Sequence, residues 1–167
     1  DTLEYRAAKK ASFATLELTK TIDKPIDRFK VLVKGKDKAG EFYRKNFAAM
    51  FAYCSNRIPE ISDDFYKIDD AMKAGFGWEN GPFEIWDAIG VEKGIELMKA
   101  EGYQPASWVT DMLASGNTSF YSIKDGATHF YSISNKKVEK IPGQDAFIIL
   151  NDIRNSKKIW NNSESII

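Results

Sequence analysis

The chain is organised around one stretch rich in glycine and aromatic residues, Gly75-Phe76-Gly77-Trp78-Glu79-Asn80-Gly81-Pro82-Phe83-Glu84-Ile85-Trp86-Asp87-Ala88-Ile89-Gly90. Three glycines within its first seven residues predict a tight turn, because glycine enters backbone conformations that other residues avoid. Pro82 predicts the first residue of a helix, where the N–H that proline lacks would have no partner. Gly90 marks the end of that helix. The stretch therefore predicts an aromatic turn that leads directly into a short helix.

The composition is that of one globular unit of 167 residues, with 24 basic and 24 acidic side chains. This balance argues against nucleic acid as a partner. No apolar run approaches the roughly 20 residues of a membrane span. Cys54 is the single cysteine and His129 the single histidine, which excludes an internal disulfide and a histidine-based metal site. We expect a cytoplasmic protein without a bound metal. Because the chain starts at Asp1 with no apolar leader, we also expect a segment of a longer protein.

The first two thirds of the chain carry a helical pattern. Residues 1–35 are expected to form linker helices, over residues 3–19 and from Pro25 to Gly35. The strongest pattern runs from a capping Asp37 to Ile58, where Pro59 ends the helix. The rest of the helical domain at 36–116 is expected to be a helix capped by Ser62 or Asp63 that reaches Gly75, the Pro82 helix, and two helices that end at Gly102 and Gly116.

After Asn117 the periodicity changes from helical to alternating. Strands at 120–123 and 130–133 flank Asp125-Gly126, which is typical of a type I′ hairpin turn. Further short strands are expected at 138–141 and 146–150, before a polar tail. Residues 117–167 thus form a small β-containing bridge with a tail. The fold class is mainly α, with a β-hairpin or meander appendage.

Catalytic motifs are weak in this chain. The glycines at 75, 77 and 81 do not have the spacing of a dinucleotide-binding loop and follow a predicted helix instead of a strand. His129 falls in the hairpin, and Cys54 lies on the apolar face of the long helix, where a buried thiol is inert. Asp63, Asp64, Glu84 and Asp87 fall in or near first helical turns, where capping explains them. We therefore predict no catalytic residue.

An aromatic cluster is predicted around the turn, formed by Phe76, Trp78, Phe83 and Trp86. Four large rings exceed what a turn requires. Core packing is the main explanation for such a cluster, and contact with a partner protein or a ligand is the alternative explanation.

The central motifs resemble the C-terminal helical domain of 3-hydroxyacyl-CoA dehydrogenases. The resemblance covers about residues 37–102 and rests on Ile68-Asp69-Asp70-Ala71-Met72, the glycine-rich turn, Gly81-Pro82-Phe83-Glu84 and Asp87-Ala88-Ile89-Gly90. The fuller pattern is similar to the long bacterial fatty-acid oxidation enzymes, in which a dehydrogenase part is joined to an enoyl-CoA hydratase part. It includes Ser55-Asn56-Arg57-Ile58-Pro59-Glu60-Ile61 and Leu113-Ala114-Ser115-Gly116.

The resemblance implies NAD-dependent oxidation of 3-hydroxyacyl-CoA to 3-ketoacyl-CoA in fatty-acid β-oxidation. The family's dinucleotide fingerprint and catalytic His–Glu dyad belong to a Rossmann domain that no segment here matches, so NAD is implied for the parent enzyme and no cofactor is expected on this segment. Neither Asn46 nor Asn56 takes over the family's substrate-facing asparagine. The implied partners are acyl-CoA through the parent enzyme, its Rossmann and hydratase domains, and a second copy in a homodimer.

The segment itself is expected to serve as a wall of the substrate pocket or as an interdomain or dimer scaffold, inactive alone. Candidate residues for the acyl-CoA pocket or interface are Phe76, Trp78, Gly81, Pro82, Phe83 and Trp86. The alternative is a noncatalytic helical module that docks a protein partner through its aromatic cluster.

Overall fold

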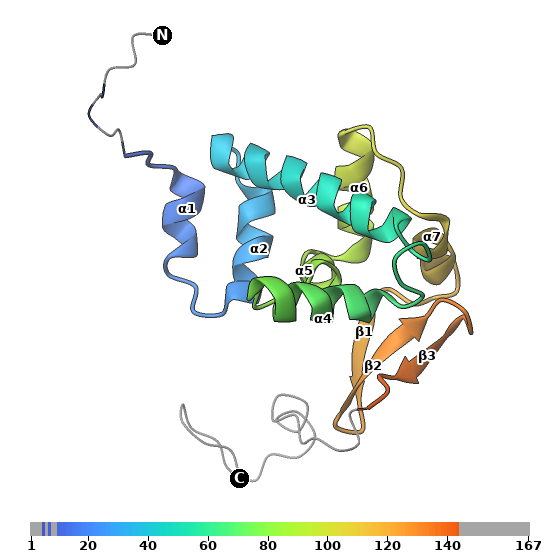
Figure 1. Ribbon diagram of the computed structural model, residues 1–167. Coiled ribbons are helices and arrows are strands. Elements are labelled where there is room, and N and C mark those ends of the chain that lie inside the picture. The colour runs from blue at the N-terminus through green and yellow to red at the C-terminus, as the bar shows by residue number, and fades with distance from the viewer. Residues whose placement is uncertain (1–4, 6, 8–9, 144–167) are drawn as a thin grey trace.

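The computed structural model describes residues 5, 7 and 10–143, which form a layer of helices with a small antiparallel sheet at one end (Figure 1). The fold class predicted from the sequence is confirmed. The helices and strands are α1 (Ala14–Thr19), α2 (Pro25–Lys34), α3 (Lys38–Asn56), α4 (Phe65–Phe76), α5 (Pro82–Ile89), α6 (Val91–Ala100), α7 (Ser107–Ala114), β1 (Tyr121–Lys124), β2 (Ala127–Ser132) and β3 (Lys137–Lys140).

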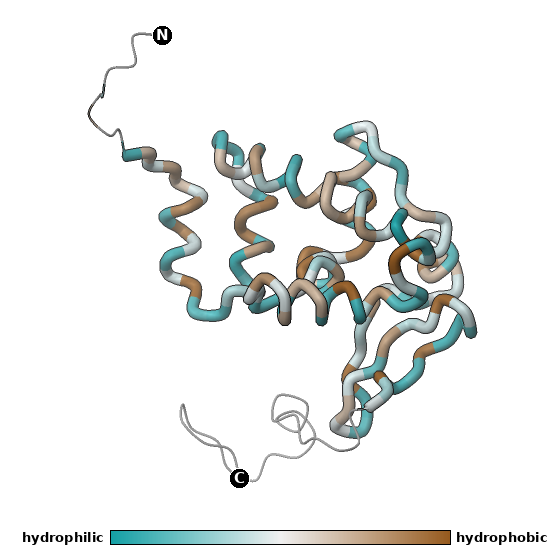
Figure 2. Tube along the Cα trace, in the orientation of Figure 1, coloured by the Kyte–Doolittle hydropathy of each residue, from teal (hydrophilic) through white to brown (hydrophobic). Residues whose placement is uncertain are grey.

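The long helix α3 is the centre of the helical layer, and it packs against α2, α5 and α6. Asp37 caps its start, because its carboxylate accepts the Gly40 N–H at 3.0 Å. The buried face of α3 carries Phe47 and Phe51, and the Phe51 ring stacks on Trp86 of α5 with centroids 4.7 Å apart. Figure 2 shows hydrophobic segments in the middle of α2 and in α5. The core therefore lies between these helices.

The sheet shares this core. Strand order is β1-β2-β3, with Tyr121 opposite Phe130 and Tyr131 opposite Val138. Phe120, Phe130 and Tyr131 are buried in one core with Phe65 and Tyr66 of α4 and Phe83 and Trp86 of α5. The predicted hairpin is confirmed, since Asp125 and Gly126 adopt φ angles of 53° and 70°, as a type I′ turn requires.

The helix predicted over residues 3–19 was too long. Among the described residues of this range, only Ala14–Thr19 are helical, and residues 10–13 are irregular. The start of α1 is set by a tertiary contact, because the Thr15 N–H donates to Asp37 Oδ2 at 2.9 Å. A periodicity pattern contains no information about such a bond.

The predicted cap of α4 was also wrong. The helix starts after Asp64, whose side chain makes no capping bond. Ser62 Oγ instead bonds the backbone of Asp64, accepting from its N–H at 3.3 Å and donating to its carbonyl at 3.0 Å. This local turn uses the hydroxyl that was expected to cap the helix.

The predicted ends of several helices are confirmed, and two predicted features lie beyond the described chain. The ends of α4, α5 and α6 fall near Gly77, Gly90 and Gly102, all with positive φ. The strand predicted at 146–150 and the polar tail lie outside the described residues. No helix in the described part of the chain combines the length and the apolar composition that a membrane crossing requires.

Trp86 leaves no room for a side chain at Gly94. Its indole N–H donates to the Val91 carbonyl at 3.0 Å, which places the ring against the first turn of α6. A Cβ at Gly94 would overlap Trp86 Nε1, whereas a Cβ at Gly75 in α4 would meet no atom within 4 Å.

We predict that Gly94→Ala lowers the free energy of unfolding by about 2 to 3 kcal/mol, because the added methyl group displaces a buried indole. The matched Gly75→Ala is expected to raise it by about 0.5 to 1 kcal/mol through lower chain entropy in the unfolded state. Urea denaturation of both variants measures these changes in the free energy of unfolding. Equal changes in the two variants would contradict the packing of Trp86 against Gly94.

Candidate functional site

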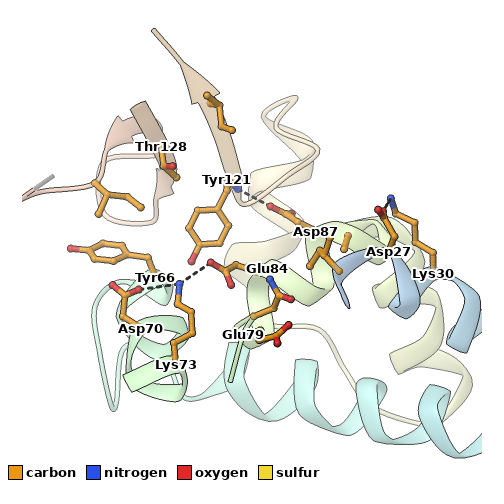
Figure 3. A pocket seen from close by; sticks show the side chains of 15 residues that line it. Asp27, Lys30, Tyr66, Asp70, Lys73, Glu79, Glu84, Asp87, Tyr121 and Thr128 are labelled. Carbon is orange, nitrogen blue, oxygen red and sulfur yellow. Dashed lines mark hydrogen bonds and ion pairs between the residues drawn. The ribbon is translucent and has the colours of Figure 1, made fainter. Parts of the chain in front are cut away.

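A pocket of about 700 Å³ lies between α2, α4, α5 and the sheet (Figure 3). It is lined by Ile26, Asp27, Lys30, Tyr66, Asp70, Lys73, Glu79, Asn80, Glu84, Asp87, Ala88, Tyr121, Ile123, Thr128 and Ile141. Five of these residues are acidic and two are basic. The pocket is thus acidic on balance, with an apolar border.

Both lysines of the pocket are already paired with carboxylates. Lys73 Nζ lies between Glu84 at 2.8 Å and Asp70 at 3.2 Å, as Figure 3 shows. Lys30 pairs with Asp27 at 3.2 Å. An anionic ligand would therefore meet the carboxylates with no unpaired pocket lysine to receive it, so phosphate groups are disfavoured here.

Asp69 is fully buried beside this pocket and joins three elements. Its carboxylate accepts the N–H groups of Phe83 at 2.9 Å and Glu84 at 3.0 Å, and the Tyr121 hydroxyl at 2.8 Å. The N-cap residue of α5 is Gly81, which has no side chain that could cap the helix. A Cβ at Gly81 would overlap the Asp69 side chain. Asp69, on α4, therefore supplies the cap that α5 lacks locally.

Glu84 completes the start of α5. Its second oxygen accepts the Gly81 N–H at 2.8 Å, as in a capping box. The capping role expected for Glu84 is confirmed.

Asp87 has a different role from the one expected. It does not cap a first turn, because it lies near the end of α5. Its two oxygens accept the N–H groups of Phe120 and Tyr121, each at 2.8 Å. The Asp87 carboxylate therefore fastens the start of β1 to α5, across 33 residues of sequence.

Burial controls the protonation of these groups. It raises the pKa of Asp69 and of Asp87 to about 7, against the opposing effect of the N–H and O–H donors. Burial and the neighbouring Asp69 also raise the pKa of Tyr121. Desolvation raises the pKa of the Cys54 thiol to about 11, so at neutral pH it is not a thiolate nucleophile.

The six candidate contact residues fall into two groups. Gly81, Pro82, Phe83 and Trp86 are buried, and they position α5 in the core. Phe76 and Trp78 are 75% and 39% exposed. The single aromatic cluster predicted from the sequence was wrong, because Phe83 and Trp86 lie in the core whereas Phe76 and Trp78, on either side of Gly77, are exposed. Contact of any of the six with acyl-CoA or a partner stays a prediction.

Asp69 and Tyr121 were missed by the sequence reasoning. One signal was present, since Asp69 follows Phe65 by four residues and so lies on the buried stripe of its helix. A carboxylate at a core position requires partners. Their identity was not readable, because Tyr121 lies 52 residues further along the chain.

Known proteins contain segments that are similar in sequence to this part of the chain. Residues 42–124 match the family model described as 3-hydroxyacyl-CoA dehydrogenase, C-terminal domain. The chain contains a domain of this family. The matched segment runs from α3 through β1, so it includes both carboxylate contacts with β1.

Relatives of the dehydrogenase domain are much longer than this chain. A probable 3-hydroxyacyl-CoA dehydrogenase of Bacillus subtilis (strain 168) is 38% identical over 130 residues, which is 78% of this chain and 16% of that protein. A putative fatty acid oxidation complex trifunctional enzyme of Rickettsia prowazekii (strain Madrid E) is 27% identical over 77 residues, 46% of this chain and 11% of that protein. No solved structure matches the chain.

The described residues of the dehydrogenase domain do not fit a nicotinamide dinucleotide. Such a cofactor needs a glycine-rich loop between a parallel strand and a helix. Here the sheet is antiparallel, and the glycine-rich turn follows the helix α4. Glu79 and Glu84 beside that turn would repel a pyrophosphate. The described residues also contain no group of three metal-binding side chains.

The raised pKa of Asp87 predicts a pH effect on stability. Folded Asp87, with a pKa of about 7, keeps a proton that the unfolded chain, with a pKa near 3.8, releases. This contribution is complete below about pH 4 and is lost as the pH rises through about 7. The amide of Asp87→Asn does not titrate. The free energy of unfolding of the native chain minus that of this variant should therefore fall from about pH 5 to about pH 8. We expect roughly 1 to 2 kcal/mol, a value reduced for the solvent that Asp87 still meets.

Chemical denaturation across this pH range measures the difference. Because Asp69 is present in both proteins, its titration largely cancels. A difference that grows with pH would show that the two N–H donors dominate and keep Asp87 ionised.

Proposed function

We propose that this chain is the helical-domain segment of a longer NAD-dependent 3-hydroxyacyl-CoA dehydrogenase of fatty-acid β-oxidation, and that it acts there as a scaffold with no activity alone. The family match and the names of the relatives support the parent activity. The parent's Rossmann and hydratase domains are the proposed neighbours of this segment, and a homodimer is proposed as its assembly.

The use of the buried carboxylates carries the scaffold proposal. Asp69 and Asp87 are carboxyl groups near the pocket whose pKa is raised to about 7, and such groups are usual candidates for acid–base catalysis. Here all their oxygens accept hydrogen bonds from the backbone of α5 and β1 or from Tyr121. Both groups are therefore engaged in holding the fold.

Contact with the substrate is proposed for the exposed turn. Phe76 and Trp78 are the two candidate residues with rings at the surface. The acidic pocket next to them is unsuited to the phosphates of CoA, so we propose contact with the apolar part of the substrate or with a neighbouring domain. Consistent with a single thiol, the proposed location of the parent enzyme is the cytoplasm.

The activity assay separates the two parts of this proposal. The chain alone, mixed with NAD and a 3-hydroxyacyl-CoA, is expected to form no NADH, whereas the complete polypeptide of the same reading frame is expected to form it. Turnover by the chain alone would contradict the scaffold role. Inactivity of the complete polypeptide would contradict the dehydrogenase assignment.

A noncatalytic docking module is the second candidate, and the exposure of Phe76 and Trp78 favours it. Tryptophan fluorescence during an acyl-CoA titration discriminates the two, because Trp78 is partly exposed while Trp86 is buried. A saturable change that disappears in Trp78→Phe supports the substrate contact. An unchanged signal supports the docking module.

A further inference from the structure

A second hollow lies between α1 and the first turns of α3. Helix α1 and the start of α3 are at the opposite end of the helical layer from the sheet (Figure 1). Its volume is about 350 Å³, and it is lined by Phe13, Leu16, Lys38, Ala39, Phe42 and Tyr43. We call it the α1–α3 groove. Apart from Lys38, its walls are apolar or aromatic.

The walls of the groove are held firmly by one carboxylate. Asp37 accepts the Thr15 N–H of α1 through Oδ2 at 2.9 Å and the Gly40 N–H of α3 through Oδ1 at 3.0 Å. Gly35 lies against Thr15 and Gly40 so closely that neither glycine has space for a Cβ. The groove is therefore pre-formed, which lowers the entropy cost of binding to it.

The open side of the groove is aromatic. Phe42 is 60% exposed although it packs edge-on against Tyr43, with ring centroids 5.5 Å apart. Small-molecule sites bury most of their ligand's surface. A wall this exposed better matches a shallow groove that receives side chains of a polypeptide.

Two lysines lie at the start of α3, at the same end of the helix as the groove. Lys38 is the first residue of α3, where the helix dipole disfavours a cation, and Lys36 precedes the capping Asp37. Neither lysine forms an ion pair within residues 10–143. Glu41, in the same turn, pairs with Lys45 at 2.7 Å. Lys34 differs, because it lies in the last turn of α2, where a cation is favourable.

We propose that the α1–α3 groove docks an acidic amphipathic segment of a partner polypeptide. Large apolar side chains of the segment fill the groove against Leu16 and Phe42, and its carboxylates pair with Lys36 and Lys38. This charge complementarity selects the occupant, since an apolar groove alone would accept many partners. The proposal does not depend on the dehydrogenase activity.

The test uses the full chain and three fluorescently labelled synthetic helices of about four turns. One carries a leucine face and a glutamate face, the second replaces glutamate by lysine, and the third replaces leucine by serine. Fluorescence anisotropy is expected to show that the Leu/Glu helix binds at least about tenfold more tightly than either control and more weakly at high salt. Equal binding of the three helices, or no binding, would overturn the proposal.

Matched variants locate the binding. Phe42→Ser and Lys38→Glu should each weaken the Leu/Glu helix about tenfold. Tyr53→Ser, at an aromatic residue of α3 that is 66% exposed outside the groove, should leave binding unchanged. Equal losses in all three variants would place the contact elsewhere. Concentration-dependent self-association that Phe42→Ser abolishes would identify a second copy as the occupant and would also overturn the proposal.

Discussion

The buried carboxylate of Asp69 is the contact on which the arrangement of α4, α5 and β1 depends. It accepts two N–H groups from the first turn of α5 and the hydroxyl of Tyr121. Since Gly81 has no side chain and no space for one, the cap of α5 must come from another helix. A local feature of the sequence, a glycine before a proline, thus requires a tertiary partner.

Asp87 and the aromatic core complete the same junction. Asp87 binds the backbone at the start of β1, and Phe120, one residue before that strand, packs against Phe83 and Trp86. Polar and apolar contacts therefore act on the same three elements, and the fully buried Asp69 lies in an apolar environment that strengthens its hydrogen bonds. Groups engaged in this way are unsuited to catalysis, which is why we propose that the segment contributes surfaces to a larger enzyme.

Local patterns predicted most of the fold. The boundaries of α3 and α5 and the hairpin at Asp125-Gly126 follow from helical periodicity, Pro82 and the demand of a type I′ turn for positive φ. Long-range features were not predictable in this way. The start of α1 depends on Asp37, and the partner of Asp69 lies on a distant strand. The positions of the aromatic rings were also not predictable, because packing between distant elements buries Phe83 and Trp86 and leaves Phe76 and Trp78 exposed.

Two neighbouring aspartates on α4 offer the most direct measurement of the role of Asp69. Asp69→Ala leaves three donors without an acceptor, so it is expected to lower the free energy of unfolding by about 3 kcal/mol or to prevent folding. Asp70→Ala removes only a surface ion pair with Lys73, so it should change the free energy of unfolding by less than about 0.5 kcal/mol. Urea denaturation of both variants at neutral pH gives these values. Similar small losses in both would contradict the view that Asp69 organises the fold.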